Sequence, residues 1–369
     1  MYNPRYRRNC SIIAGVAAAA LLLAGCNEQS EQAAPVSAAA DAEVTGQTGQ
    51  LTGEGATSQQ KAMEYFRAAY GQTIPGASFD YTATGSGAGQ KQFINGTVDF
   101  GGSDSPLNDE QQTAAQARCN NNPAWHLPLV IGPVAVAYHL SGVDTVVLSP
   151  PVIAQIFAGT ITTWNDPAIA ALNEGVSLPD TPIAVIYRSE ESGTSDNFQK
   201  FLTAAAPGQW STTGKSFPTA TGAGANGSKG VVTEVAATEG AITYVEAGFT
   251  RDVADVNVAA IDFGAGPVAL DPDSVGIALD NLTYVGSGHD MVVDAKQLFA
   301  MQTPGAYPLV LTTYEIVCSK GYEPEVAARV KDFLSVALSV QDDTLAEKGY
   351  IPVQGDYKAK LEAAVAAIE

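Results

Sequence analysis

The sequence has few of the residues that build metal centres and hydrolase active sites. Only three histidines occur in 369 residues, at His126, His139 and His289. They lie far apart and none has a partner four residues away, so no metal-binding pattern is present. The chain also has no G-x-S-x-G segment and no plausible Ser, His, Asp set. We therefore expect no metal, no other cofactor and no enzymatic activity.

Basic residues are also scarce. The chain carries 19 Lys and Arg against 39 Asp and Glu, a formal net charge of −20. No basic tract could follow the phosphates of a nucleic acid, so we exclude nucleic-acid binding. Net charge governs solubility and steering, whereas a buried site depends on its nearest donors. The acidic balance is therefore compatible with a local anion site, with the acids on outer faces.

An apolar run at residues 12–24 follows three arginines and is too short to span a bilayer as a mature helix. We expect residues 1–25 to be a signal peptide. The segment Leu23-Ala24-Gly25-Cys26 looks like the lipobox of a bacterial lipoprotein, which would leave Cys26 as the acylated N-terminus; an uncleaved anchor or a plain signal peptide is the alternative. Each of these exports the protein. Residues 26–50 lack periodicity and predict a flexible tether.

The four cysteines reduce to two if Cys10 leaves with the leader and Cys26 is lipidated. Cys119 and Cys318 then remain in a compartment where disulfides persist. A bridge between them would close about 200 residues and stabilise the fold by on the order of 5 kcal/mol in the chain-entropy model. We predict this disulfide, with two buried free thiols as the alternative.

Beyond the tether, short Val- and Ile-rich runs alternate with helical stretches, which predicts an α/β fold. The expected strands cover 78–82, 127–139, 183–187, 242–245 and 309–318. The expected helices cover 59–70, 90–95, 150–157, 167–173, 196–206, 229–237, 295–301, 323–339 and 341–348. No period of 20 to 50 residues recurs, so a solenoid or propeller is not expected.

The segment Arg188-Ser189-Glu190-Glu191-Ser192-Gly193-Thr194-Ser195 runs directly into the helix expected over 196–206. The helix is expected because apolar residues share one face and a Pro-Gly pair supplies the stop. A cation, hydroxyls and a glycine at a helix start are the arrangement that an oxyanion requires. Free amides at Gly193, Thr194 and Ser195 would point toward such a ligand.

Two upstream turns repeat this pattern. Residues 51–58, Leu-Thr-Gly-Glu-Gly-Ala-Thr-Ser, lead into the helix expected over 59–70, which Gly71 should end. Residues 84–89, Thr-Gly-Ser-Gly-Ala-Gly, lead into a short segment at 90–95. Three turns that each open a helix and carry Ser or Thr could converge on a single anion.

These motifs carry a family resemblance. The chain resembles the extracytoplasmic phosphate-binding proteins of ABC-type phosphate importers in four segments that occur in the family order. They are the opening motif at 51–57, the turn Gly85-Ser86-Gly87, the run Val98-Asp99-Phe100-Gly101-Gly102-Ser103-Asp104, and Arg188 to Thr194. The agreement extends from residue 51 to about residue 352.

The resemblance implies a type II periplasmic-binding-protein fold, a Venus flytrap of two lobes joined by a two-segment hinge. One lobe would combine residues 51–135 with 308–369, and the other would comprise residues 136–307. Segments near 134–139 and 309–314 would cross between the lobes. The resemblance also implies inorganic phosphate as the ligand, an ABC-type phosphate permease as the partner, and a monomer that is lipid-anchored outside the cytoplasmic membrane.

The resemblance assigns ligand contacts to residues in all three turns. Simple helix capping is the alternative role for each Ser or Thr, and a surface salt bridge is the alternative for the arginine. The candidate phosphate-binding residues are Thr57, Ser58, Ser86, Asp104, Arg188, Ser192, Gly193 and Thr194.

Asp104 is the most diagnostic candidate, because a carboxylate in an anion site repels the ligand unless the ligand brings a proton to share. Phosphate carries such a proton at neutral pH and sulfate does not. An ordinary turn with an Asx cap is the alternative role for Asp104.

Glu190 and Glu191 depart from the family pattern Arg-x-Asp-Gly-Ser-Gly-Thr. Glu190 is one methylene longer than the usual Asp, and we expect it to orient Arg188 with altered geometry. Glu191 replaces a glycine, so this turn should not need a positive φ there.

Three rivals remain. A binding protein for another oxyanion is the nearest one, for arsenate, a phosphate ester, sulfate or molybdate, and a surface lipoprotein with a sensing or adhesive role is also open. A serine penicillin-recognising enzyme is the third, because Ser58-x-x-Lys61 and Ser195-Asp196-Asn197 match two of that family's three motifs. The third motif, Lys-Thr-Gly, is absent.

Overall fold

The computed structural model describes residue 39 and residues 41–369, except 219, 252 and 281. The predicted signal peptide, the predicted lipid-acceptor Cys26 and most of the predicted tether therefore lie outside the described residues. Within the described part of the chain, no helix is both long and apolar enough to cross a membrane.

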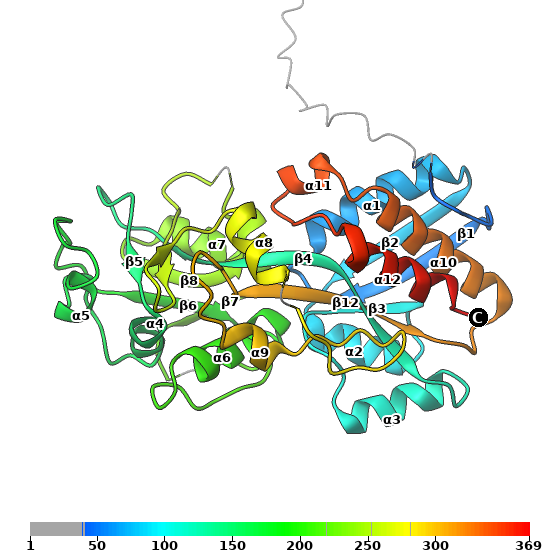
Figure 1. The fold of residues 1–369 in the computed structure, drawn as a ribbon, viewed down its shortest axis with the longest axis horizontal. Helices are drawn as coiled ribbons and strands as arrows, with labels where there is room; N and C mark the ends of the chain where they lie inside the picture. The colour runs from blue at the N-terminus through cyan, green and yellow to red at the C-terminus, as the bar shows by residue number, and fades with distance from the viewer. Residues whose placement is uncertain (1–38, 40, 219, 252, 281) are drawn as a thin grey trace, which may run out of the picture. The chain divides into compact units, whose positions relative to one another are not determined.

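A mixed sheet of nine strands runs through the protein (Figure 1). Its strands are β1 (Gly49–Gly55), β2 (Ala77–Ala83), β3 (Phe100–Ser103), β4 (Ala124–Tyr138), β6 (Ala184–Arg188), β7 (Ala223–Ala225), β8 (Ala241–Glu246), β9 (Asn257–Val258) and β12 (Val310–Cys318). The order is β2-β1-β3-β12-β4-β8-β6-β7, and β9 also pairs with β4. A second sheet has the order β11-β10-β5, from β5 (Val147–Leu148), β10 (Ala260–Asp262) and β11 (Pro267–Val268).

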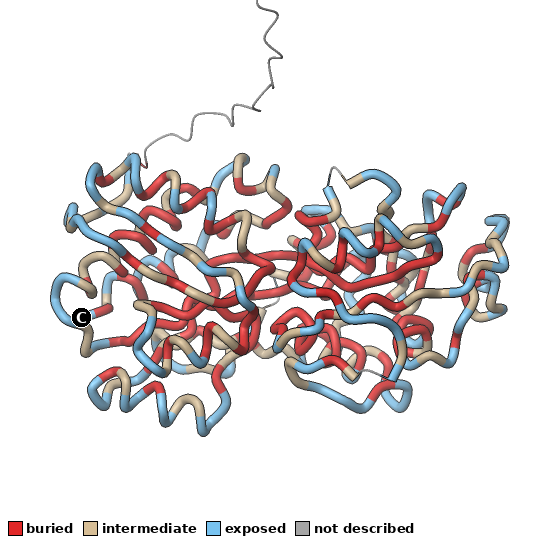
Figure 2. The backbone as a smooth tube through the Cα atoms, turned by 180° about the vertical axis from the view of Figure 1, so that it is seen from behind, coloured by how far each residue is buried: buried red, intermediate tan, exposed pale blue. Residues whose placement is uncertain are grey.

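The long strand β4 belongs to two halves of the large sheet. Its residues 124–133 pair antiparallel with β12, and its residues 134–138 pair antiparallel with β8. In one half, β1 pairs parallel with both β2 and β3; in the other, β6 pairs parallel with both β7 and β8. Nearly every residue of β4 and β12 is buried (Figure 2), although Thr312, Thr313 and Glu315 interrupt the apolar sequence of β12.

Helices cover both faces of each half, which is the α/β fold predicted from the alternating pattern (Figure 1). Around the half that contains β1–β3 lie α1 (Gln60–Thr73), α2 (Ser86–Ile94), α3 (Asp109–Arg118), α10 (Pro324–Ser339) and α12 (Gly355–Ala366). Around the half that contains β6–β8 lie α4 (Pro150–Phe157), α6 (Gly193–Ala205), α7 (Gly227–Ala237) and α9 (Ala295–Phe299). Further helices are α5 (Pro167–Ala170), α8 (Pro272–Leu279) and α11 (Asp343–Glu347).

The structure corrects several predicted helix boundaries. Helix α1 continues through Gly71 to Thr73, because the chain breaks away only where Pro75 follows Ile74. The turn at Ser86 is itself the first turn of α2, and α6 begins at Gly193 rather than at Asp196. At α2 and α6 the small residues placed before the amphipathic run therefore belong to the helix, whereas those of residues 51–55 lie in β1.

The predicted disulfide is confirmed. Cys119 at the end of α3 is bonded to Cys318, the last residue of β12, with the two Cα atoms 5.4 Å apart. The bridge ties a helix to the central strand within one half of the sheet.

The folded chain begins earlier than residue 51. The buried carboxylate of Asp332 on α10 accepts hydrogen bonds from the amides of Thr45, Gly46 and Gln47, at 2.7, 3.0 and 3.1 Å. The Thr45 hydroxyl adds a fourth, at 2.9 Å. Part of the segment predicted as tether is thus held on the surface of α10.

Candidate functional site

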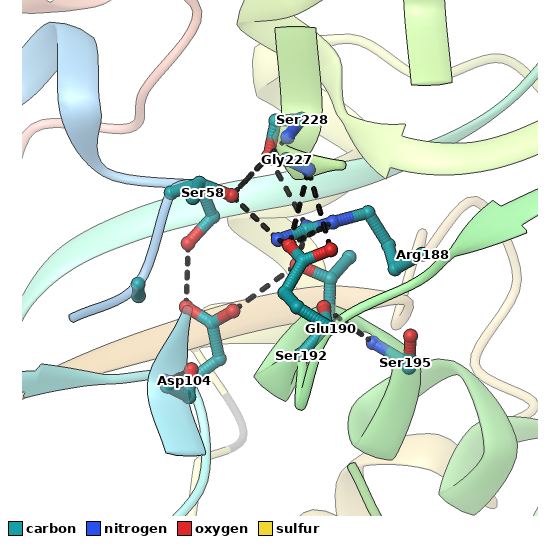
Figure 3. Close-up of polar contacts among 12 residues, drawn as sticks. Ser58, Asp104, Arg188, Glu190, Ser192, Ser195, Gly227 and Ser228 are labelled. Atoms are coloured by element: carbon teal, nitrogen blue, oxygen red, sulfur yellow. Dashed lines mark hydrogen bonds and ion pairs between the residues drawn. The ribbon is translucent and has the colours of Figure 1, made fainter. Parts of the chain in front are cut away.

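The carboxyl ends of several strands and the N-termini of four helices meet where the two halves of the sheet face each other. Parallel strands present the residues that follow them at one edge of a sheet, which is where α/β proteins commonly bind ligands. Figure 3 shows side chains from both halves pointing toward one another. The contributing segments are the turn between β1 and α1, the start of α2, the residue after β3, the end of β6, and the starts of α6 and α7.

Arg188, the last residue of β6, extends its guanidinium into this cluster and is 2% exposed. Its Nη2 donates to Thr57 Oγ1 at 2.6 Å. Its Nη1 lies 3.4 Å from both Thr194 Oγ1 and Ser228 Oγ. The guanidinium therefore contacts hydroxyls from α6, α7 and the turn before α1.

Glu190 contacts Arg188 directly. Arg188 Nε donates to Glu190 Oε1 at 2.7 Å, and Nη2 forms an ion pair with the same oxygen. The amide of Gly227 also donates to Glu190 Oε1, at 3.1 Å (Figure 3). Glu190 thus links the arginine to the first residue of α7 and fixes the plane of the guanidinium.

Asp104 follows β3 and its carboxylate accepts three hydroxyl hydrogen bonds. Ser58 Oγ and Thr313 Oγ1 donate to Oδ1 at 2.6 and 2.8 Å, and Thr194 Oγ1 donates to Oδ2 at 3.1 Å. Burial raises the pKa of Asp104 above its ordinary value, and Ser58, Thr313, the charge of Arg188 and Thr194 oppose that rise. Asp104 is therefore a buried acceptor that is already surrounded by donors.

The start of α6 approaches the other half of the sheet closely. A Cβ on Gly193 would lie 2.3 Å from Ser86 Oγ and 2.6 Å from Asp104 Cβ, so only glycine fits here. Ser86 Oγ accepts the amide of Asp104 at 3.0 Å. Asn197, one turn into α6, donates through Nδ2 to the carbonyl oxygens of Asp104 and Gly193, at 2.6 and 2.9 Å.

Ser192 and Ser195 have capping and packing contacts. Ser192 Oγ accepts the amide of Ser195 at 3.2 Å, the N-cap geometry that was the alternative role for Ser192. The expectation of a free amide at Ser195 is therefore wrong, because the cap uses it. The hydroxyl of Ser195 lies 2.6 Å from Tyr244 Oη, which is buried in the half that contains β6–β8. Gly193 and Thr194 remain in the first turn of α6, where helix amides have no intrahelical acceptor.

Sequence reasoning missed Ser228 and Thr313. Ser228 lies in the first turn of α7, and its Oγ is 3.0 Å from Thr57 Oγ1 while its amide donates to the same oxygen at 3.2 Å. The run Gly222-Ala-Gly-Ala-Asn-Gly-Ser228 is a fourth small-residue turn before a helix, so a signal was present. Thr313 lies inside β12 and had no such signal.

The cluster combines a guanidinium, a buried carboxylate, several hydroxyls and helix N-termini. Such a set can bind an oxyanion that carries both negative charge and a proton, because the cation and the amides bind the charge while the carboxylate accepts the proton. Within the part of the chain that the structure describes, no group of three or more His, Cys, Asp and Glu side chains could hold a metal ion.

The model of a family described as "PBP superfamily domain" matches residues 40–341. Phosphate-binding protein PstS 3 of Mycobacterium leprae is 42% identical over 362 residues, covering 96% of this chain and 97% of that protein. Phosphate-binding protein PstS 2 of Mycobacterium tuberculosis is 41% identical over 370 residues, covering 99% of this chain and all of that protein. The protein PstS of Pasteurella multocida is 29% identical, with 87% of this chain and 91% of that protein covered.

Solved structures share the fold at lower identity. A high-affinity periplasmic phosphate-binding protein (PfluDING), solved with bound phosphate, superposes with a TM-score of 0.69 at 24% identity, covering 85% of this chain and 93% of that chain. A putative phosphate ABC transporter substrate-binding protein from Clostridium perfringens, with bound phosphate, has a TM-score of 0.60 at 20% identity, covering 83% of this chain and all of that chain. These likenesses place the chain in an α/β fold shared with periplasmic binding proteins.

Proposed function

The chain belongs to the PBP superfamily and, within it, to the PstS-like phosphate-binding proteins, and on this basis we propose that it binds inorganic phosphate outside the cytoplasmic membrane for an ABC-type importer. The protein would act as a non-catalytic receptor that captures the ion and delivers it to the membrane subunits of a phosphate permease. No cofactor takes part in this scheme.

One observation carries the proposal: Arg188 and Asp104 contact the same hydroxyl. Thr194 Oγ1 lies 3.4 Å from Arg188 Nη1 and 3.1 Å from Asp104 Oδ2. A fixed cation and a carboxylate acceptor are thus held next to each other in a buried set of hydroxyl groups. Hydrogen phosphate needs both, because its charged oxygens require donors and its protonated oxygen requires an acceptor.

Phosphate would replace hydrogen bonds that the site residues now make to one another. Its charged oxygens would accept from Arg188, Thr57, Thr194, Ser228 and the first amides of α6. Its protonated oxygen would donate a hydrogen bond to the Asp104 carboxylate. Sulfate has no proton to donate and would face the carboxylate as a like charge, so Asp104 would disfavour sulfate. Ser58 and Ser86 support the ligand or Asp104 from the half that contains β1–β3.

Closure of two lobes would control capture and release. The lobes would be residues 51–135 with 308–369, and residues 136–307, with the hinge near 134–139 and 309–314. The change of partner of β4 at residues 133–134, from β12 to β8, supports this division. The hydrogen bonds from Arg188 to Thr57 and from Thr194 to Asp104 would then form only when the lobes are closed, and binding would shift the population toward that state.

We place the mature protein on the outer face of the cytoplasmic membrane as a monomer. Removal of the signal peptide would leave Cys26 as the acylated first residue. The segment that follows would connect it to the folded chain, where Ala39 is buried and donates its amide to Thr73 Oγ1 at 2.9 Å.

A binding protein for arsenate or a phosphate ester is the nearest alternative, because both carry phosphate-like charge and arsenate has similar protonation. The enzyme alternative has little support in the contacts of its motif residues. Lys61 Nζ donates to the carbonyl oxygen of Gly248 at 2.7 Å, and the hydroxyl of Ser58 is bound to Asp104. A lysine held in this way is not placed to act as the base for Ser58.

Isothermal titration of the mature protein, stripped of ligand by partial unfolding, tests the proposal. We expect tight one-to-one phosphate binding near neutral pH, with no response to sulfate at the concentrations that saturate the site with phosphate. Arg188→Ala should lose roughly 100-fold or more in phosphate affinity, since a buried charged partner is removed. Asp104→Ala should weaken phosphate binding and admit sulfate. Equal binding of both anions by the wild type would contradict the role of Asp104, and no response to phosphate, arsenate or a phosphate monoester would overturn the proposed function.

A further inference from the structure

Gln90 lies one turn after Ser86 on α2 and is fully buried. Its side-chain amide faces the segment that carries Asp104. Nε2 lies 3.0 Å from Ser103 Oγ, 2.8 Å from the carbonyl oxygen of Ser105 and 3.3 Å from that of Pro106. Its Oε1 accepts from Gln111 Nε2 of α3 at 3.1 Å, which fixes the amide with the NH₂ group toward the segment.

The segment 103–107 is held from several sides, and these contacts determine where Asp104 lies. Ser103 Oγ donates to the carbonyl oxygen of Ser105 at 2.6 Å, which closes a tight turn around Asp104. Beyond the turn, the amide of Leu107 donates to the buried His126 Nε2 at 3.0 Å. The backbone that follows Asp104 is therefore bound to side chains of other elements, Gln90 on α2 and His126 on β4.

Ser86 and Gln90 are four residues apart, so they share one face of α2. The Ser86 hydroxyl accepts a hydrogen bond from the amide of Asp104, and Gln90 binds Ser103 and Ser105, the residues before and after Asp104. One helix face thus binds the backbone amide of Asp104, the side-chain hydroxyl of Ser103 before it and the backbone carbonyl oxygen of Ser105 after it. The same helix has its N-terminus in the candidate site, so the carboxylate and the helix start are kept in a constant relative position.

We propose that Gln90 is a positioning residue that holds the Asp104 carboxylate where it can accept a proton from the bound oxyanion, and thereby sets the selectivity of the site for phosphate over sulfate. This inference rests on the proposed phosphate-binding function and deepens it. The physical reason is distance. If the Asp104 carboxylate shifts by about 1 Å, it loses its hydrogen bond from the protonated oxygen of phosphate, and its negative charge lies farther from sulfate and repels it less. Gln90 makes no contact with the ligand in this scheme.

The test measures the ratio of the sulfate Kd to the phosphate Kd, by titration and by competition, for the full mature protein. Gln90→Met keeps the length of the side chain and removes the amide. Gln92→Met is the matched control, since Gln92 lies on the same helix and its Oε1 accepts only from the exposed Thr97 hydroxyl, at 2.9 Å, in the described contacts. Melting temperatures are recorded for both variants.

We expect Gln90→Met to lower the ratio about tenfold or more, by weakening phosphate binding and strengthening sulfate binding, while Gln92→Met leaves it unchanged. If Gln90 had a purely structural role, the variant would have a lower melting temperature and would bind both anions more weakly by the same factor, so the ratio of the two Kd values would not change. That result would overturn the inference. If Gln90→Met does not fold, Ser103→Ala provides the same comparison, because it removes one of the three acceptors and the turn-closing hydroxyl. An unchanged ratio in that variant overturns the inference as well. Failure of the wild type to bind phosphate would instead contradict the proposed function.

Discussion

Lys91 Nζ lies 2.5 Å from Glu191 Oε2, so an ion pair joins α2 to the turn that precedes α6. The backbone reinforces the contact, because the amide of Gly87 donates to the carbonyl oxygen of Glu191 at 3.0 Å. A Cβ on Gly87 would lie 2.5 Å from Glu191 Cβ, which shows how closely the two halves of the sheet approach here. Glu191, a departure from the family pattern, thus bridges the halves beside the candidate site.

The Lys91–Glu191 ion pair should slow ligand release if it forms only when the lobes are closed. Both side chains are largely exposed, so the pair is worth at most about 1 kcal/mol. We expect Lys91→Met and Glu191→Gln each to raise the phosphate dissociation rate about two- to fivefold at low salt, with the difference shrinking in high salt. Stopped-flow displacement measures this rate, and additive effects in the double variant would show that the two charges act independently.

Thr313→Val should move the acid limit of phosphate binding to higher pH. Thr313 donates to Asp104 Oδ1 at 2.8 Å and so favours the ionised carboxylate. Burial already raises the pKa of Asp104, and removal of this donor raises it further. Asp104 would then become protonated, and unable to accept the ligand's proton, at a higher pH than in the wild type.

The measurement is the phosphate Kd between about pH 4.5 and 8 for the wild type and the variant. Thr312→Val is the control, because Thr312 is also buried in β12 but donates to Tyr314 Oη, at 3.2 Å. A shift to lower pH in Thr313→Val, or an equal shift in both variants, would contradict the assigned role of this hydroxyl.

Sequence reasoning located the parts of the site that follow local rules. Arg188 lies at the end of an apolar run and Thr194 at the start of an amphipathic one, so the sequence predicts the end of the strand and the start of the helix. The predicted strand over 183–187 and the disulfide between Cys119 and Cys318 are likewise close to what the structure shows.

Contacts between segments that are far apart in the sequence could not be predicted in this way. Thr313 reaches Asp104 because β12 pairs with β3, an antiparallel neighbour some 200 residues away in sequence, and the apolar run around Thr313 carries no sign of this partner. The role of Glu191 also depends on how closely α2 packs against its turn. Helices α3, α8 and α12 were not predicted. The apolar positions of α3 are few, with Ala115 its one buried residue. Local periodicity finds elements, whereas cross-sheet neighbours decide which side chains share a site.

Glu315→Gln should stabilise the ligand-free protein increasingly as the pH rises. Burial raises the pKa of Glu315 well above the ordinary carboxyl value, the nearby Asp104 charge raises it further, and the amide of Gln59 opposes this at 3.3 Å. The protonated form is therefore the one the fold favours. Its stabilising contribution is complete below the ordinary pKa and is lost as the pH rises through the raised pKa, when the carboxylate must ionise in the interior.

Glutamine keeps the shape and carries no charge, so the difference in melting temperature between Glu315→Gln and the wild type should grow with pH. Glu174→Gln, at an exposed position, provides the control and should show a constant, small difference. A pH-independent difference for Glu315→Gln would mean that Glu315 does not change protonation on folding over the range tested.

Loss of the Cys119–Cys318 disulfide should lower stability without changing ligand binding. The bridge spans 199 positions of the chain, and its loop-closure contribution is about 5 kcal/mol at most. We expect the double Cys→Ser variant to melt up to roughly 10 °C lower, with the phosphate Kd within about twofold of the wild type. An unchanged melting temperature would show that the unfolded state of the reduced chain retains compact structure.

Asp332→Asn should release the N-terminal segment from α10. The carboxylate of Asp332 accepts three amides and a hydroxyl from residues 45–47, and it is 1% exposed. Asparagine replaces one acceptor oxygen with an NH₂ group that would face these donors, so the variant should lose roughly 1–3 kcal/mol of stability.

Hydrogen exchange at residues 45–47 should become faster than in Asp180→Asn, an exposed control. Phosphate affinity should not change, because the contact lies outside the candidate site. Unaltered exchange at these amides would mean that the pairing of β1 with β2, which begins at Gly49 and Ala77, is sufficient to hold the segment without Asp332.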